Sequence, residues 1–98
     1  MIDDRFDMFF SIVWYNGYSE CIEGWIARME SGSNECPLDV MPNDRDGAFE
    51  FGQLQALWMI LVNWFGDYGG SPRHGWIEES NLAECTMFLK KVVEKCNE

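Results

Sequence analysis

The chain has 98 residues, of which 47% are hydrophobic and 15% aromatic, so an intrinsically disordered chain is excluded and one domain over residues 1–98 is expected. Seventeen Asp and Glu against seven Lys and Arg give a formal net charge of −10. This charge argues against binding to nucleic acid or to an anionic membrane surface, because both would be repelled over most of the protein.

The first predicted helix lies near the start of the chain, where apolar residues recur at the spacing of one helical face: Phe6, Phe9, Phe10, Val13 and Trp14. Asp3 and Asp4 precede them, at a position where acidic side chains stabilise a helix N-terminus. Asn16 and Gly17 end the pattern. As an alternative, residues 11–15 could form a strand, with Asn16-Gly17 as the turn of a short N-terminal hairpin.

The second helix is predicted from about Glu20 to Ser31, with Ser19 as its N-cap and Gly32 as a left-handed stop. Its apolar stripe consists of Ile22, Trp25, Ile26 and Met29. The polar stretch from Gly32 to Gly47 predicts a long loop. Three apolar residues could hold the middle of this loop against the core while its acids face outward: Leu38, Val40 and Met41.

The third helix is predicted from about Ala48 to Phe65, and Gly66 ends it. Its apolar residues are Phe51, Leu54, Leu57, Trp58, Leu61, Val62 and Phe65. Residues 51–66 carry no charge, but the stretch is shorter than the roughly 20 apolar residues of a bilayer span. We therefore interpret it as a central helix that neighbours cover on several sides.

A glycine-rich loop from Gly66 to Trp76 comes next, and a fourth helix is expected to start near Ser80 or Asn81. The apolar stripe of this helix is Leu82, Cys85, Leu89, Val92, Val93 and Cys96, with Lys90, Lys91 and Lys95 near its C-terminus. Lysines at that end favour the helix macrodipole. The four segments together predict an all-α fold, a small four-helix bundle-like domain with two long loops.

The cysteines indicate packed, reduced thiols in a cytoplasmic protein. Met1 is followed by Ile2, Asp3 and Asp4, whereas a secretory leader begins with basic residues. The sequence has four cysteines, no C-x-x-C pair and only one histidine, His74. A zinc site is therefore not expected, and no other metal or cofactor is indicated.

The glycine-rich loop offers candidate residues for catalysis and for structure. It lacks a phosphate-binding pattern and follows a helix instead of a strand. A nucleophile would require Ser71 or a cysteine to be activated by His74 and oriented by Asp67, and adjacency in the sequence alone does not indicate that these side chains meet. We favour a structural role for the loop. In this interpretation Gly69 and Gly70 take positive φ angles, Pro72 stiffens the turn, Asp67 and Arg73 form an ion pair, and Trp76 anchors the loop to the helices.

The sequence from Asp67 to Ile77, DYGGSPRHGWI, lies between an apolar helix and an amphipathic one. In this it resembles small bacterial immunity proteins of polymorphic toxin systems, of the contact-dependent growth inhibition or bacteriocin type. The resemblance covers about thirty residues and leaves the first half of the chain unassigned. It implies a non-enzymatic, cytoplasmic protein that neutralises one toxin domain, often a nuclease, by tight stoichiometric binding.

The charge distribution selects the residues expected to bind this partner. Carboxylates can pair with the Lys and Arg side chains that a nuclease uses to hold phosphate. The candidates are Trp76, the acids beside it and the acids of the middle loop: Trp76, Glu78, Glu79, Glu35, Asp39, Asp44 and Asp46. The alternative function is that of a phage or mobile-element protein that inhibits a host nucleic-acid-binding protein by charge mimicry. That function predicts a periodic array of acids, and the third helix has only Glu50, at its start.

Overall fold

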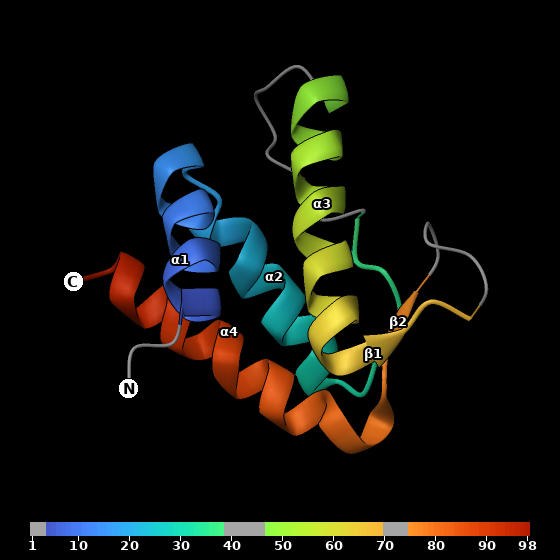
Figure 1. Ribbon diagram of the computed structural model, residues 1–98. Helices are drawn as coiled ribbons and strands as arrows, with labels where there is room; N and C mark the ends of the chain where they lie inside the picture. Colours follow the sequence, from blue (N-terminus) through green and yellow to red (C-terminus); the bar gives the residue numbers. More distant parts are fainter. Residues whose placement is uncertain (1–3, 39–46, 70–74) are drawn as a thin grey trace.

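The computed structural model describes residues 4–38, 47–69 and 75–98, except for the side chains of Gly47 and Ala48. In this part of the chain the elements are α1 (Asp4–Asn16), α2 (Ser19–Glu30), α3 (Gly47–Phe65), β1 (Gly66–Asp67), β2 (Trp76–Ile77), a 3-10 turn η1 (Glu79–Asn81) and α4 (Leu82–Cys96) (Figure 1). The fold is mostly helical, which confirms the predicted all-α class. The alternative N-terminal hairpin is wrong, because residues 11–15 lie inside α1.

The turn between α1 and α2 depends on one glycine and one buried tyrosine. Gly17 has φ +70°, and the Tyr18 N–H donates a hydrogen bond to the Val13 carbonyl at 2.9 Å. Ser19 is not the N-cap, contrary to the prediction: α2 begins with Ser19 itself, Tyr18 occupies the cap position, and no side chain caps the helix. The Tyr18 ring is fully buried and its hydroxyl donates to Gln53 Oε1 on α3, so packing fixes the start of α2.

The fourth helix packs against all three others within the described residues. Cys85, Leu89, Val92 and Val93 are buried, as their spacing predicts. The third helix is less covered than expected, since Phe49 and Phe51 are 65% and 43% exposed. In Figure 1 the first turns of α3 extend beyond α1 and α2, although Glu50 and Leu54 in this half of the helix are buried.

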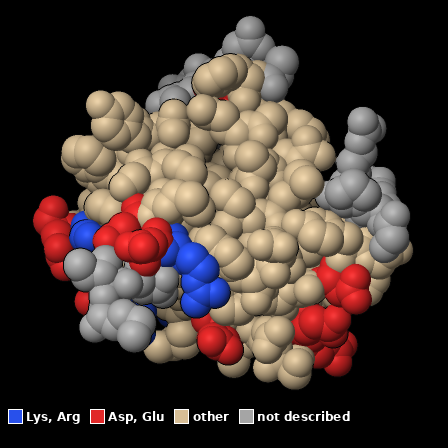
Figure 2. All heavy atoms as spheres, viewed as in Figure 1, with Lys and Arg blue, Asp and Glu red and all other residues tan. Residues whose placement is uncertain are grey.

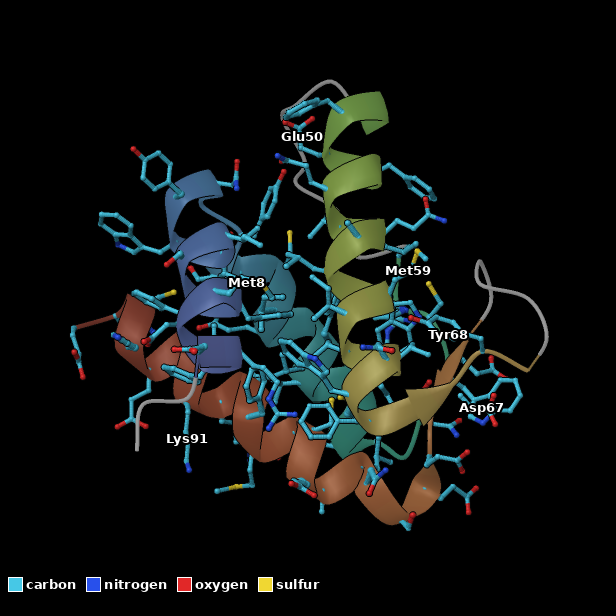
Figure 3. All side chains as sticks on the ribbon, viewed as in Figure 1. Met8, Glu50, Met59, Asp67, Tyr68 and Lys91 are labelled. Carbon is cyan, nitrogen blue, oxygen red and sulfur yellow. The ribbon has the colours of Figure 1, made fainter. Side chains whose placement is uncertain are left out.

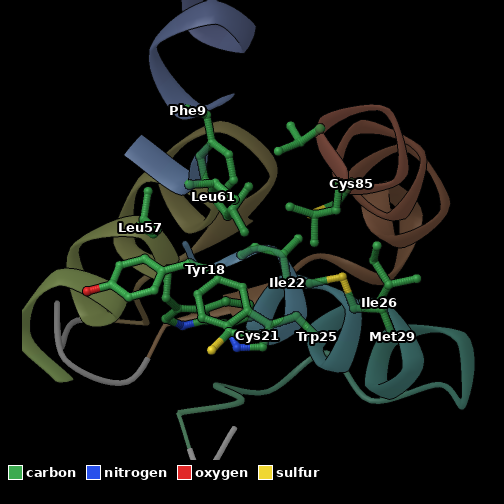
Figure 4. Close-up of a cluster of buried hydrophobic side chains, with 14 of the residues drawn as sticks. Phe9, Tyr18, Cys21, Ile22, Trp25, Ile26, Met29, Leu57, Leu61 and Cys85 are labelled. Atoms are coloured by element: carbon green, nitrogen blue, oxygen red, sulfur yellow. The ribbon is translucent and has the colours of Figure 1, made fainter. Parts of the chain in front are cut away.

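The core lies where α1, α2, α3 and α4 meet (Figure 4). Trp25 of α2 and Trp58 of α3 pack edge to face, with ring centroids 6.0 Å apart. Such a pair contributes about 0.5–1.5 kcal/mol beyond the burial of its surface. The Trp58 indole N–H donates to the Gly75 carbonyl at 3.3 Å, so the core also holds the residue before β2.

The sequence did not predict the short antiparallel pair of β1 and β2, in which Gly66 faces Ile77 and Asp67 faces Trp76. On the other side of β2, two hydrogen bonds join Asn34 to Ile77. The Ile77 N–H donates to the Asn34 carbonyl at 2.9 Å, and Asn34 Nδ2 donates to the Ile77 carbonyl at 2.9 Å. The segment after α2 is thereby joined to the strand pair. No helix in the described part of the chain has the length and apolar character needed to cross a membrane.

Candidate functional site

The strand pair exposes one tryptophan next to acidic side chains. Successive residues of a strand face opposite ways, and in β2 Ile77 is fully buried while Trp76 is 37% exposed. Asp67 lies opposite Trp76 on β1 and is exposed. In Figure 3 Asp67 lies at the outer end of the strand pair, away from the helices.

A glycine beneath the indole fixes the position of Trp76. Gly69 has φ +57°, and a β-carbon built on it would lie 2.4 Å from two ring carbons of Trp76. The Gly69 N–H donates to Asp67 Oδ1 at 2.8 Å, which is how an aspartate typically closes a tight turn. The anticipated partner of Asp67, Arg73, lies outside the described residues, as do Gly70 and Pro72.

Three residues that follow α2 form a hollow with Trp76. Asn34, Glu35, Cys36 and Trp76 line a cavity of about 500 Å³. Glu35 is exposed, and Asn34 ties its segment to β2. The structure therefore brings together Glu35 and Trp76, two residues that the sequence analysis selected from positions far apart in the chain.

The other selected acids fall into two groups. Glu78 and Glu79 directly follow β2; Glu78 is half-buried and its N–H donates to the Phe65 carbonyl at 3.0 Å, while Glu79 is exposed on η1. The three remaining acids of the middle loop lie outside the described residues: Asp39, Asp44 and Asp46. We refer to Glu35, Asp67, Glu78 and Glu79 around Trp76 as the acidic face.

Charged side chains are unevenly distributed over the surface (Figure 2). In this view, acidic side chains gather over the strand pair and the start of α4 with no described Lys or Arg among them, whereas the described basic side chains that are visible lie at the end where α1 begins. Away from the strand pair, Lys90 lies 3.0 Å from Glu30, and Lys95 lies 3.8 Å from Asp7. By contrast, no member of the acidic face forms an ion pair with a described residue.

Sequence reasoning missed one member of this face and misplaced two aromatic residues. Asp67 was assigned to loop structure, yet its pairing with Trp76 places it beside the candidate partner-binding residues. Trp14 and Phe51 were assigned to apolar stripes but are 59% and 43% exposed, and Tyr15 is 84% exposed. Helical periodicity alone could not reveal this, because it does not show where a neighbouring helix stops.

The catalytic alternative has no described geometry, because Ser71 and His74 lie outside the described residues. Within the ranges that are described, no three His, Cys, Asp or Glu side chains come together to hold a metal ion. None of the four cysteines is in a disulfide; Cys21 and Cys85 are buried, and Cys36 and Cys96 are partly exposed. Burial raises the pKa of Cys85 from 9.0 to about 12, and the Glu84 carboxylate adds to the rise.

Comparison of the chain with protein-family models, curated proteins and solved structures finds no match.

Proposed function

We propose that this protein binds a cognate basic toxin domain, for which a nuclease is the first candidate. It would neutralise the toxin by covering its cationic surface in a stoichiometric complex, without catalysing a reaction. The proposal follows the resemblance to small bacterial immunity proteins. One observation supports it most directly: a half-exposed tryptophan, Trp76, lies among carboxylates that have no ion pair with a described residue.

The chemistry of the acidic face suits a surface rich in Arg and Lys. Carboxylates form short, charge-assisted hydrogen bonds with guanidinium groups, and an indole ring attracts a cation over its face. Glu35 and Trp76 line the same cavity, so a single arginine side chain could use both interactions there. Tryptophan and arginine are also the residues that most often dominate protein interfaces.

Hydrogen bonds and close packing hold parts of the acidic face in place, which lowers the free-energy cost of ordering them on binding. The hydrogen bond from Asn34 to the Ile77 carbonyl holds the backbone next to Glu35 against β2. The ring of Trp76 packs directly on Gly69, which restricts its position. The remaining partner-binding candidates, Asp39, Asp44 and Asp46, stay part of the proposal on their charge alone. Negative charge that has no ion pair with a described residue would also speed association with a cationic partner, and this acceleration weakens with salt.

The test uses the full chain and a basic C-terminal toxin domain encoded beside it. Isothermal titration calorimetry at low and high salt gives the affinity of the wild type and of a variant in which the acidic face is neutral: Glu35→Gln, Asp67→Asn, Glu78→Gln and Glu79→Gln. The control removes the same charge elsewhere, at four exposed acids without a described ion pair: Glu20→Gln, Glu23→Gln, Glu94→Gln and Glu98→Gln.

We expect the first variant to lose roughly 100-fold in affinity, which corresponds to about 2.7 kcal/mol, and to lose most of its salt dependence. The affinity of the control variant should stay within about threefold of the wild type, because exposed charges that lie away from the interface contribute little. An equal loss in both variants would contradict the proposed surface. A basic domain that does not bind the wild type at all would contradict the proposed function.

A further inference from the structure

A second cavity, of about 620 Å³, lies between the start of α1, the end of α3 and α4. Pockets of this size commonly hold small molecules. It is separate from the acidic face: Figure 3 shows Lys91, which lines the cavity, and Asp67 at opposite ends of the molecule. The lining residues are Arg5, Phe6, Asp7, Trp64, Phe65, Asn81, Glu84, Met87, Phe88 and Lys91.

Aromatic rings make up much of the cavity wall, and Phe88 lies at their centre. Its ring centroid is 5.7 Å from that of Phe6, at 83°, and 5.8 Å from that of Trp64, at 72°. Phe65 packs against it as well, with a centroid distance of 5.7 Å. Edge-to-face and offset contacts are the favoured geometries of aromatic pairs, and a ligand ring against this wall would make contacts of the same kind.

Two basic side chains line the same cavity. The Arg5 guanidinium lies over the Trp64 ring, 5.4 Å from its centroid. Lys91 is exposed and, among the described residues, has neither an ion pair nor a ring contact. The neighbouring lysines differ, since Lys90 pairs with Glu30 and Lys95 contacts Asp7 and the ring of Phe10.

The acids of the cavity wall define where an anion could sit. Lys95 lies 3.8 Å from Asp7 and offsets its charge. Glu84 lies on α4 seven residues before Lys91, which places the two about 10.5 Å apart along the helix axis. An anion near Lys91 would therefore lie about two helical turns from the backbone of Glu84, whose carboxylate lines the same cavity and opposes the binding of an anion.

We propose that this cavity binds a small aromatic carboxylate, with its ring against Phe6, Trp64 and Phe88 and its carboxylate at Arg5 and Lys91. The rings bury the apolar part of the ligand, and the two cations select its charge. This site does not depend on the proposed toxin binding, because it uses none of the residues of the acidic face.

The test is an NMR titration of the full chain with 1-naphthaleneacetate, followed through backbone amide shifts. Two matched probes replace the carboxylate: neutral 1-naphthaleneethanol and cationic 1-naphthylmethylammonium. We expect shifts centred on residues 5–7, 64–65 and 84–91, and an affinity that falls from the anion to the neutral probe to the cation. Absence of saturable binding, shifts centred elsewhere, or tightest binding of the cation would overturn the proposal.

Adjacent lysines provide the matched variants. Lys91→Gln should weaken binding of 1-naphthaleneacetate about threefold to tenfold, a range set by the exposure of this lysine to solvent. Lys90→Gln removes the same charge one residue away, beside Glu30, and should change the affinity less than about twofold. Glu84→Gln should strengthen binding of the anion. Equal effects of the two lysine variants would show that net charge, and not this cavity, attracts the probe.

Discussion

The indole ring of Trp76 lies directly against Gly69, so closely that a β-carbon at residue 69 would approach two ring carbons to 2.4 Å. Gly69 also has φ +57°, a backbone conformation that costs an L-residue with a side chain roughly 1–2 kcal/mol. A substitution at this position therefore acts on the strand pair and on the exposed tryptophan together.

Replacing this glycine tests whether it fixes the ring. We expect Gly69→Ala to lower the free energy of unfolding by about 1–2 kcal/mol and to increase the exposure of Trp76, because the ring must move to admit the methyl group. Urea denaturation measures the first effect and acrylamide quenching of tryptophan fluorescence the second. Unchanged stability together with unchanged quenching would contradict this geometry.

The helical Gly52 is the natural counterpart to Gly69. It lies in α3 and is exposed, and a β-carbon built on it would meet nothing within 4 Å. Gly52→Ala should therefore raise the free energy of unfolding by about 0.5–1 kcal/mol, because alanine loses less backbone entropy in a helix than glycine does. Thermal unfolding monitored by circular dichroism would detect this; a lower melting temperature would contradict it.

The side chain of Asn34 should stabilise β2. Asn34→Ala removes the hydrogen bond from Nδ2 to the Ile77 carbonyl and keeps the backbone bond from the Ile77 N–H. We expect a loss of about 1 kcal/mol in the free energy of unfolding and faster hydrogen exchange at the Ile77 amide. Asn63→Ala, at an exposed position of α3, is the control and should leave that exchange rate unchanged.

The Cys85 thiol should make the protein less stable in alkali. Its pKa is raised from 9.0 to about 12 in the folded chain, so between these values the unfolded chain releases a proton that the folded chain keeps. The contribution of Cys85 to stability is thus complete below pH 9 and is lost as the pH rises toward 12, with a slope of up to about 1.4 kcal/mol per pH unit.

Other groups titrate in the same range, so the comparison is between slopes. Urea denaturation at several pH values from 8 to 11 should give a shallower fall in the free energy of unfolding for Cys85→Ala than for the wild type. The substitution also leaves a small cavity. This cavity lowers the free energy of unfolding equally at every pH, so it does not contribute to the difference in slope. Identical slopes in both proteins would contradict an unusually high pKa at Cys85.

The helices could be predicted because each repeats its apolar residues with helical spacing and ends near a residue that breaks the pattern. Gly32 follows α2 with φ +97°, and the stripe from Cys85 to Val93 is buried in α4. The exact start of α2 could not be predicted, since Tyr18 reaches Gln53 on a distant helix. That packing overrides the local preference of Ser19 for a cap position.

Residue spacing did not reveal the strand pair or the full candidate surface. Strands of two residues are too short to show alternation, and the hydrogen bonds between Asn34 and Ile77 span 43 residues of sequence. The charge distribution alone led to Glu35, Glu78 and Glu79. Asp67 was missed as a surface acid because only the register of β1 and β2 places it opposite Trp76.

The pairing of Gly66 with Ile77 has an evolutionary consequence. It brings together the two ends of the connection between α3 and α4, and each end is already held by the core. A change in the length or sequence of that connection would alter the proposed binding surface at little entropic cost. If the proposed function holds, selection for a new partner could thus revise this connection while the helical scaffold stays intact.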